Sequence, residues 1–509
     1  MKRKLAVLVM LILATLTLLG VTTDGVLTIA VEKDARSLDP IVVGDNASFQ
    51  MYIQVFDPLV SVTPNLEIVP SLATWETEDS QTWVFHIREG IKFHNGDLLT
   101  ADDVVYTFKT VMDPATSSPN FENLKIINSI EKLDHYTVKI VLQYPFAAFL
   151  ERVFTQPIVN AKVREADPTA YGLKPIGTGP FVVEKWEKNN QLVLIRNENY
   201  WMKYPNLAKV IMKPIPEHSV ALVNLESGDV DMVMSVLPDD FDRIRKNQKL
   251  ELQIVPALNY YYLAFNVANT PVSDINVRKA IYMGVDMNAI VKAVLGEAGV
   301  RAQSSLSPSS WAYNKEVEKY ALTYNPTEAI KLLKEAGYAN GFEITIYTPQ
   351  DTYRRKIAEL MQIQLAAIGI KARVESLEWA SYLPLIDVGK CSMYMMGWNW
   401  LTDPDGLIYD IHHSQIDAWK TGASSYNGTR FYSEVVDKAL EDARKISDPA
   451  QRKILYGTVQ DVIFSNYVHI PLFHRVSMTA INKRVKGYVT NAIEYTFLCT
   501  PETNVWVEN

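Results

Sequence analysis

The stretch FHNGDLLTADDVVYTFKTVMDP, residues 93–114, decides how the fold of this 509-residue chain is interpreted. Just before it, alternate residues from 83 to 87 are large and apolar, as in a strand with one buried face. Asn95-Gly96 predicts a tight turn. Thr100 predicts the start of a capped helix whose apolar residues share one face, and Asp113-Pro114 ends that helix. Locally, the sequence therefore predicts a strand, a turn and an amphipathic helix in succession.

The rest of the chain shows the same pattern, in which short predicted strands alternate with amphipathic helices. This alternation is typical of α/β lobes, and the length predicts more than one domain. The sequence contains no internal repeat and no low-complexity linker. The clearest helices are expected at 277–295, 326–337, 351–368, 433–445 and 450–464, followed by a strand-like segment at 469–473.

The N-terminus predicts export. Lys2, Arg3 and Lys4 precede an apolar run at residues 5–19, which is short for a membrane span and fits a signal peptide cleaved near Thr23. An uncleaved N-terminal anchor is the alternative. Because residues 1–23 hold three cationic and no acidic side chains, their removal takes the net charge from −8 to −11. Such an acidic chain is a poor partner for nucleic acid or an anionic membrane.

Metal, cofactor and catalytic motifs are not found in the sequence. His412-His413, His469 and His474 lack metal-ligand spacing and are interpreted as structural histidines, and we expect no cofactor. No nucleophile elbow is present, which argues against an enzyme. Cys391 and Cys499 could pair in an exported chain or remain buried thiols, and the sequence favours neither.

The run Gly177-Thr178-Gly179-Pro180 is similar in composition to a phosphate-binding loop. It lacks a following Lys-Ser/Thr pair, and a strand pattern rather than a helix comes after it. The run is therefore interpreted as a structural turn before a hairpin.

The strongest functional candidate is MMGWNWLTDPDG, residues 395–406. An apolar strand there leads into a loop that carries Trp398, Asn399, Trp400, Asp403 and Asp405, and ligands of α/β sheets lie beyond the carboxyl ends of strands. Indole faces can stack on a ligand, and carboxylates can hold an ammonium group. The alternative is that the indoles belong to the core and the carboxylates cap a turn. The residues alone leave both interpretations open.

Several segments together resemble the family 5 extracellular solute-binding proteins, which deliver peptides and nickel to ABC importers. Residues 93–114 resemble the family signature, and further resemblance lies in SLDPIVVGDNASFQMYIQVFDPLV (37–60), PIGTGPFVVEKWEKNNQLVLIRNENYW (175–201) and LAFNVANTPVSDINVRKAIYMGVD (263–286). The resemblance implies an α/β, periplasmic-binding-protein-like two-lobe clamshell with a smaller inserted third domain. It implies a first lobe of residues 24–52, 156–262 and 475–509, an inserted domain of 53–155 and a second lobe of 263–474.

The resemblance also implies site residues. Peptide-binding relatives carry a Gly-Trp motif followed by an Asp that holds the peptide's α-amino group, which makes Asp403 the expected anchor and Asp405 the second candidate. Dipeptide-binding relatives place an Arg for the ligand carboxylate near residues 348–350, where this chain has none. Further candidates for contact with the ligand are Tyr261, Trp379, Tyr382 and Asn46. Because side chains alternate along a strand, Tyr261 lies on the opposite face from Tyr260 and Tyr262.

The function that the sequence predicts is capture of a small solute in a cleft between two lobes, for delivery to a membrane-embedded ABC permease. We expect a monomer, periplasmic or extracytoplasmic, that carries out no covalent chemistry. A di- or oligopeptide is the first candidate ligand and an oligosaccharide the alternative. A secreted hydrolase is the alternative from a different functional class, and the sequence cannot separate transport from a chemosensory role.

Overall fold

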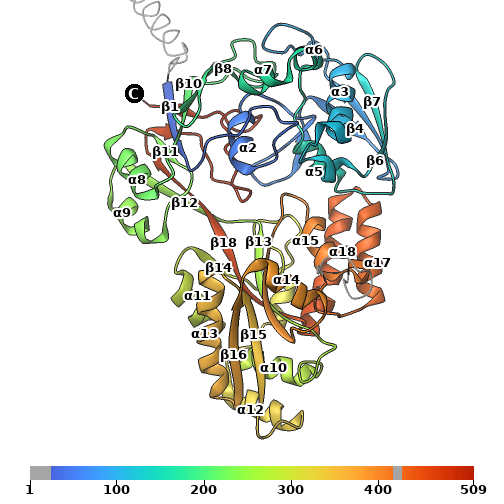
Figure 1. The fold of residues 1–509 in the computed structure, drawn as a ribbon, viewed down its shortest axis with the longest axis vertical. Coiled ribbons are helices and arrows are strands. Elements are labelled where there is room, and N and C mark those ends of the chain that lie inside the picture. The colour runs from blue at the N-terminus through green and yellow to red at the C-terminus, as the bar shows by residue number, and fades with distance from the viewer. Residues whose placement is uncertain (1–24, 417–426, 509) are drawn as a thin grey trace, which may run out of the picture.

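The computed structural model describes residues 25–416 and 427–508, which form an upper and a lower lobe joined at a narrow waist (Figure 1). The predicted signal peptide lies outside the described residues. None of the helices in the described part of the chain is long and apolar enough to cross a membrane.

One long β-sheet runs through both lobes in the order β16-β15-β17-β13-β18-β11-β1-β10-β9-β8, with β12 and β14 also pairing with β18. The upper lobe holds β1 (Gly25–Val31), β8 (Phe181–Glu187), β9 (Gln191–Arg196), β10 (Leu207–Pro214), β11 (Met232–Val233) and β12 (Leu250–Pro256). The lower lobe holds β13 (Asn259–Phe265), β14 (Gly299–Arg301), β15 (Phe342–Pro349), β16 (Ile370–Leu377) and β17 (Met393–Asn399). The two-lobe α/β fold expected from the sequence is confirmed.

Strand β18 (His469–Asn482) belongs to both lobes. Its first part pairs with β13 and β14 in the lower lobe, and from Val476 onward it pairs with β12 in the upper lobe. The sequence predicted only a strand-like segment at 469–473. The predicted segment was too short because Ser477 and Thr479 interrupt the apolar pattern. In the structure the strand continues through them and buries both side chains.

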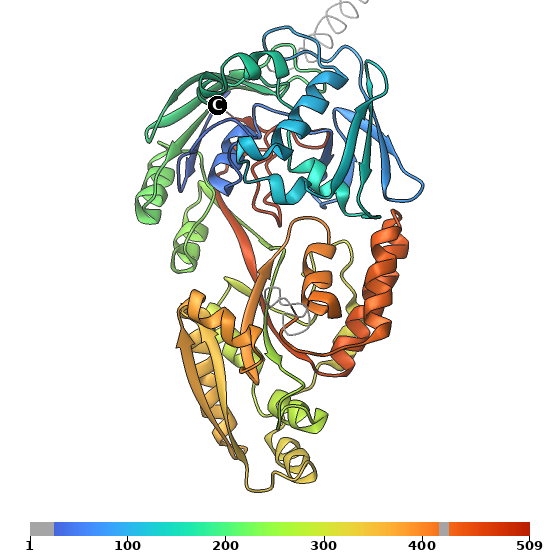
Figure 2. The same ribbon diagram turned by 45° about the vertical axis from the view of Figure 1, so that its right-hand side comes forward.

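The stretch quoted first lies beside a separate four-stranded sheet at the right of the upper lobe in Figures 1 and 2. That sheet has the order β4-β5-β7-β6 and is made of β4 (Ala73–Glu76), β5 (Thr82–Ile87), β6 (Ile127–Lys132) and β7 (Thr137–Leu142). Helix α3 (Ala101–Met112) starts with the full capping box of Thr100 and Asp103. Its apolar face, formed by Val104, Phe108 and Val111, is completely buried, so the predicted strand, turn and helix are confirmed.

Smaller elements complete the upper lobe. The helices are α2 (Asn46–Tyr52), α4 (Phe121–Leu124), α5 (Phe149–Phe154), α6 (Ala161–Ala166), α7 (Pro168–Leu173), α8 (His218–Ser227) and α9 (Phe241–Lys246). The short strands are β2 (Val60–Val62), β3 (Ile68–Pro70), β19 (Val485–Lys486) and β20 (Trp506–Val507). Helix α5 lies at the lower edge of this lobe, above the lower lobe (Figure 1).

The helices of the lower lobe include those predicted, with one of them divided in two, and also α14 (Trp379–Asp387) and α15 (Asp405–His412), which were not predicted. The predicted ones are α10 (Ile275–Met283), α11 (Met287–Leu295), α12 (Pro326–Glu335), α13 (Thr352–Ala366), α17 (Glu434–Lys445) and α18 (Pro449–Ser465). The single helix expected at 277–295 is two helices. The chain breaks after Gly284, and the Asp286 side chain caps α11 by accepting from the Ala289 N–H.

The loop at residues 177–180 is a structural turn, as predicted, and it leads into the antiparallel hairpin of β8 and β9. It packs against the backbone of Val55, whose carbonyl accepts a hydrogen bond of 2.9 Å from the Gly179 N–H. A Cβ at Gly177 would lie 2.0 Å from the carbonyl oxygen of Val55. Only glycine allows this approach of the two backbones.

Gly177→Ala should therefore lower the free energy of unfolding by at least roughly 1–3 kcal/mol, because a methyl group there forces backbone to move. Urea denaturation followed by circular dichroism measures this. Gly406→Ala is the matched control, since a Cβ there meets no atom within 4 Å. Equal stability of the two variants would show that the turn has room to spare and is not a structural constraint.

Candidate functional site

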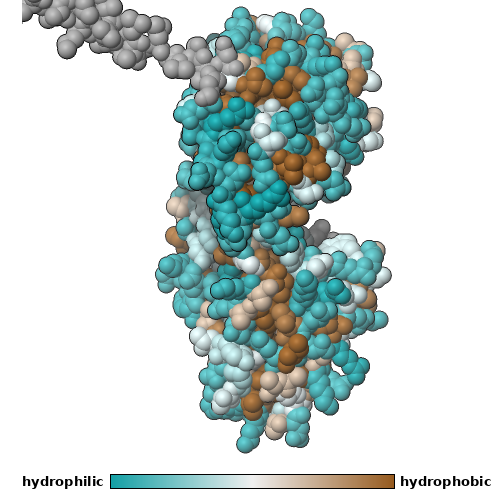
Figure 3. All heavy atoms as spheres, turned by 90° about the vertical axis from the view of Figure 1, so that its left-hand side faces the viewer, coloured by the Kyte–Doolittle hydropathy of each residue, from teal (hydrophilic) through white to brown (hydrophobic). Residues whose placement is uncertain are grey.

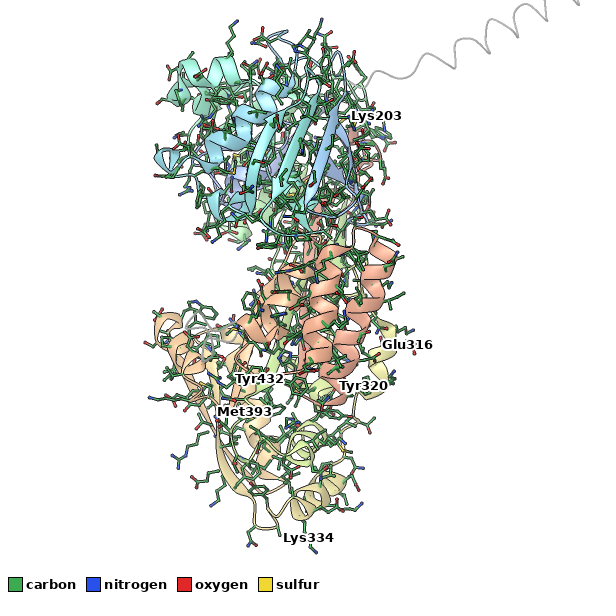
Figure 4. The ribbon with its side chains drawn as sticks, turned by 90° about the vertical axis from the view of Figure 1, so that its right-hand side faces the viewer. Lys203, Glu316, Tyr320, Lys334, Met393 and Tyr432 are labelled. Atoms are coloured by element: carbon green, nitrogen blue, oxygen red, sulfur yellow. The ribbon has the colours of Figure 1, made fainter. Side chains whose placement is uncertain are left out.

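A cavity of about 480 Å³ lies between the lobes and is called the inter-lobe cavity below. The lobes are separated by a notch that is visible from two opposite sides (Figures 3 and 4). The upper lobe lines the cavity with Gly44, Asn46, Phe49, Tyr52, Asn120, Asn123, Thr155, Glu494 and Tyr495, and the lower lobe with Asn259, Tyr261, Asn399, Trp400 and Leu401. The chain segments that cross between the lobes add Ala257, Leu258 and Arg475. A volume of this size is typical of small-ligand sites.

The Gly-Trp motif shapes one wall of this cavity. Tyr261 on β13 pairs across the sheet with Gly397 on β17, and a Cβ at Gly397 would lie 2.4 Å from the Tyr261 ring. Without that Cβ, the Tyr261 ring lies over β17 and stacks on Phe473 with centroids 4.5 Å apart. The glycine therefore sets where the tyrosine face stands in the cavity.

Trp400 is the indole that reaches the cavity. It is 7% exposed, and its Nε1–H has no hydrogen-bond partner in the described part of the chain. A buried donor without a partner is costly, and other parts of the indole form the cavity wall. Trp398 does not line the cavity. Its Nε1–H donates to the Tyr262 hydroxyl at 3.2 Å, on the face of the sheet opposite to Tyr261.

Asp403 and Asp405 do not have the ligand-binding position that the sequence predicted for them. Arg452 donates to both oxygens of Asp403 at 2.6 and 2.7 Å, and Arg444 donates to both oxygens of Asp405 at 2.8 Å. Neither carboxylate lines the inter-lobe cavity. Bidentate pairing of this kind fixes the loop onto α17 and α18. The carboxylate that sequence reasoning assigned to a ligand ammonium is thus a structural group in this conformation.

Of the other site residues predicted from the sequence, some line the inter-lobe cavity and some do not. Asn46, Tyr261 and Asn399 line the inter-lobe cavity, whereas Trp379 and Tyr382 do not. Tyr382 is completely buried and donates its hydroxyl to the Met395 carbonyl, because helix α14 packs over β17 rather than opening toward the cavity. Sequence reasoning missed Arg475 and Glu494. A charge inside the apolar run of β18 was the available signal for Arg475, and no comparable signal marks Glu494.

The loop that carries Trp400 is also hydrogen-bonded to the upper lobe. Glu151, on α5 of the upper lobe, accepts hydrogen bonds from the backbone N–H groups of Thr402 and Asp403, both at 2.6 Å, and from the Thr402 hydroxyl at 3.1 Å. Glu151 is completely enclosed, and burial outweighs these bonds and the nearby Arg152 to raise its pKa to about 6. This contact, called the inter-lobe clamp below, ties the tryptophan loop to both lobes.

A second cavity of about 560 Å³ lies on the other side of this loop and is lined by Trp75, Glu151, Trp311, Asp403 and Arg452 among others. Its buried charged groups are already paired, Asp403 with Arg452 and Glu151 with backbone amides. The inter-lobe cavity instead offers the Glu494 carboxylate, which forms no ion pair within residues 25–416 and 427–508, and the incompletely paired guanidinium of Arg475. It is therefore the better candidate for the ligand.

Metal binding and a disulfide bond have no support in the described residues. No three His, Cys, Asp or Glu side chains there are grouped closely enough to hold one ion. Burial lowers the pKa of His412 to about 3 and that of His474 to about 4, so both are neutral. Cys391 and Cys499 are buried free thiols.

Comparison with known proteins places this geometry in a family. The sequence profile of the bacterial extracellular solute-binding proteins, family 5 (middle region), matches residues 67–419. The chain is 30% identical over 485 residues to the dipeptide-binding protein of Escherichia coli K12, covering 88% of each chain. It is also 30% identical over 484 residues to heme-binding protein A of Haemophilus influenzae, covering 88% of this chain and 86% of the relative.

Two solved structures show how the lobes are arranged in similar proteins. HbpA2 from Haemophilus parasuis superposes with a TM-score of 0.87 at 27% identity, over 95% of this chain and all of that chain. The periplasmic binding protein DppA from Helicobacter pylori, in complex with the peptide STSA, gives a TM-score of 0.69 at 28% identity, over 95% and 98% of the two chains. Coverage and identity are nearly equal for the two structures, and the score is lower for the peptide complex.

The clamp generates a pH-dependent prediction. The pKa of Glu151 is raised in the folded protein, so its stabilising contribution is present below pH 4.5 and is lost as the pH rises through 6. Gln resembles the protonated acid and does not titrate. Between pH 4.5 and 7.5, wild type should therefore lose about 2 kcal/mol of stability relative to Glu151→Gln.

Denaturant unfolding of both proteins at several pH values measures this difference. Glu165→Gln serves as the control, because Glu165 is exposed. A difference between wild type and Glu151→Gln that stays constant or changes in the opposite direction would contradict the assignment.

Proposed function

The chain belongs to the bacterial extracellular solute-binding proteins of family 5, a family of binding proteins of ABC importers, and from this membership we propose that it captures a short peptide in the inter-lobe cavity and delivers it to a membrane-embedded permease. The bound solute undergoes no covalent change. In this proposal the protein is exported, acts outside the cytoplasm and works as a monomer.

The observation that carries the proposal is the inter-lobe cavity itself. Both lobes contribute to its walls, and the segments that join the lobes form its floor. A ligand that contacts both walls stabilises the arrangement in which the lobes are close together. The lower TM-score to the peptide complex supports an open conformation for the structure described here.

Peptide is favoured over the alternatives by the polar groups that the cavity presents. The walls carry a guanidinium on Arg475, a carboxylate on Glu494 and an indole donor on Trp400, in addition to several amide side chains. A zwitterionic chain with amide groups can use all of these. A neutral oligosaccharide would use the aromatic faces but would offer no carboxylate to the guanidinium, which shares Asp351 with Arg354.

The domain division expected from the sequence forms part of the proposal. The upper lobe comprises 24–52, 156–262 and 475–509 with the insertion 53–155, and the lower lobe comprises 263–474. The change of pairing partner along β18 near Val476 supports the boundary at 474–475, whereas β13, which pairs with β17 from Asn259 onward, supports a first crossing before residue 259 and not at 262–263. The crossing segments then act as the hinge.

Thermal unfolding with a ligand panel tests the function. A peptide that binds only the folded protein should stabilise it by roughly 2.7 kcal/mol when present at 100 times its Kd, which raises the melting temperature. The panel should hold di-, tri- and tetrapeptides, neutral oligosaccharides and haem. Mass spectrometry of the solute after incubation should show it unchanged.

Stabilisation by oligosaccharides or haem alone would reject peptide as the ligand while leaving the binding role intact. Cleavage of the solute at a rate that depends on the protein would favour the secreted hydrolase instead. Gly397→Ala, which displaces Tyr261 from the cavity wall, should reduce the peptide-induced shift.

A further inference from the structure

Arg475 is placed to meet a ligand from the floor of the inter-lobe cavity. Its guanidinium lies over the rings of Tyr261 and Tyr353, 4.9 and 5.5 Å from their centroids, and these rings restrict its position. The Nη2 atom pairs with Asp351 at 3.1 Å, and the buried Nε–H has no partner in the described part of the chain. The side chain is 38% exposed, so part of the guanidinium fork faces the cavity.

The charge around Arg475 is not balanced. Asp351 is the carboxylate that pairs with it, and the same carboxylate also faces the guanidinium of Arg354 at 3.4 Å. Two cations therefore share one anion, which leaves this end of the cavity with a net positive charge. A carboxylate is the group that the guanidinium fork matches in geometry and charge.

Glu494 supplies the opposite charge on the facing wall. Its carboxylate forms no ion pair or side-chain hydrogen bond with the described residues, and together with Arg475 it accounts for the formal charges among the described residues that line the cavity. Its backbone is in the left-handed region with φ of 61°, which is uncommon for a residue other than glycine. The Asn491 side chain fixes this turn by accepting from the N–H groups of Ile493 and Tyr495. The turn thus holds the carboxylate at the cavity in a strained but braced conformation.

We propose that Arg475 binds the terminal carboxylate, and Glu494 the terminal ammonium, of a short zwitterionic peptide. This inference rests on the proposed function and names the two side chains that set its specificity. Trp400 contributes a third contact, since its indole forms part of the cavity wall and offers an apolar face to the peptide. The selected ligands are peptides with both ends free and short enough for one end to lie at each charge.

Asp403, the anchor expected from the sequence, is already paired within the protein. Arg452 neutralises Asp403 within the protein, so Asp403 offers no net charge to a ligand. Burial raises the pKa of Glu494, and the charge of Arg475 offsets part of this increase, so the two side chains feel one another's charge. They are nevertheless not joined in an ion pair and remain available at opposite ends of one ligand.

The test uses the peptide that gives the largest thermal shift, in its free form, with its N-terminus acetylated and with its C-terminus amidated. Isothermal titration of wild type should show that each modification weakens binding roughly 10- to 100-fold, the usual effect of removing a charged hydrogen-bonding group. Arg475→Gln should bind the free and amidated peptides within about twofold of one another and still reject the acetylated one. Glu494→Gln should show the reverse pattern.

Lys483→Gln and Glu502→Gln are matched controls, because both residues are exposed and neither lines the cavity. Arg475→Lys keeps the charge but not the fork, so it should retain partial discrimination against the amide. Circular dichroism and the melting temperature without ligand establish that each variant is folded.

If Arg475→Gln and Glu494→Gln discriminate among the three peptide forms as wild type does, the assignment of the two ends is overturned while peptide binding stands. If wild type itself binds the modified peptides as well as the free one, the zwitterion proposal fails and the importer role is unaffected. If no peptide form binds wild type, both the inference and the proposed peptide function are rejected.

Discussion

The structure depends on one strand that is hydrogen-bonded in both lobes. Strand β18 pairs with β13 and β14 up to Arg475 and with β12 from Val476 onward, so the lobes share one backbone ladder. The second crossing is tied to the first, because the Ala257 N–H donates to the Arg475 carbonyl at 2.9 Å. Any motion of one lobe against the other must be absorbed where the partners change. Arg475, the cation on β18 at that point, lines the inter-lobe cavity.

The charged side chains near the inter-lobe cavity have two roles. Some hold the two lobes together, and others are placed to bind the ligand. Around the tryptophan loop, Asp403, Asp405 and Glu151 are buried and fully engaged, and they fix Trp400 at the cavity. In the cavity, the Arg475 Nε–H and the Glu494 carboxylate keep hydrogen-bonding capacity that none of the described residues uses, although Arg475 also pairs with Asp351. Buried charges need partners to be tolerated, so charges left without full pairing in a cleft between lobes indicate where a ligand completes them.

The sequence predicted elements with local signals and missed features that depend on distant partners. The cap of α3 at Thr100, the start of α12 at residue 326 and the break after α17 are encoded within a few residues, and each was predicted correctly. The length of β18 was not predictable, since burial of Ser477 and Thr479 is decided by strands far away in the sequence. The same holds for the site. Tyr261 followed from strand alternation, whereas the pairing of Asp403 with Arg452 and the exposure of Glu494 to the cavity arise only from tertiary contacts.

The most direct test of a clamshell that closes on its ligand is the overall dimension of the molecule in solution. Small-angle X-ray scattering of the purified protein, with and without a saturating peptide identified by its thermal shift, reports the radius of gyration. The account predicts a smaller radius and a shorter maximum dimension when the peptide is bound, because the lobes rotate together about β18. A radius that is unchanged while calorimetry confirms saturation would contradict closure as the basis of capture.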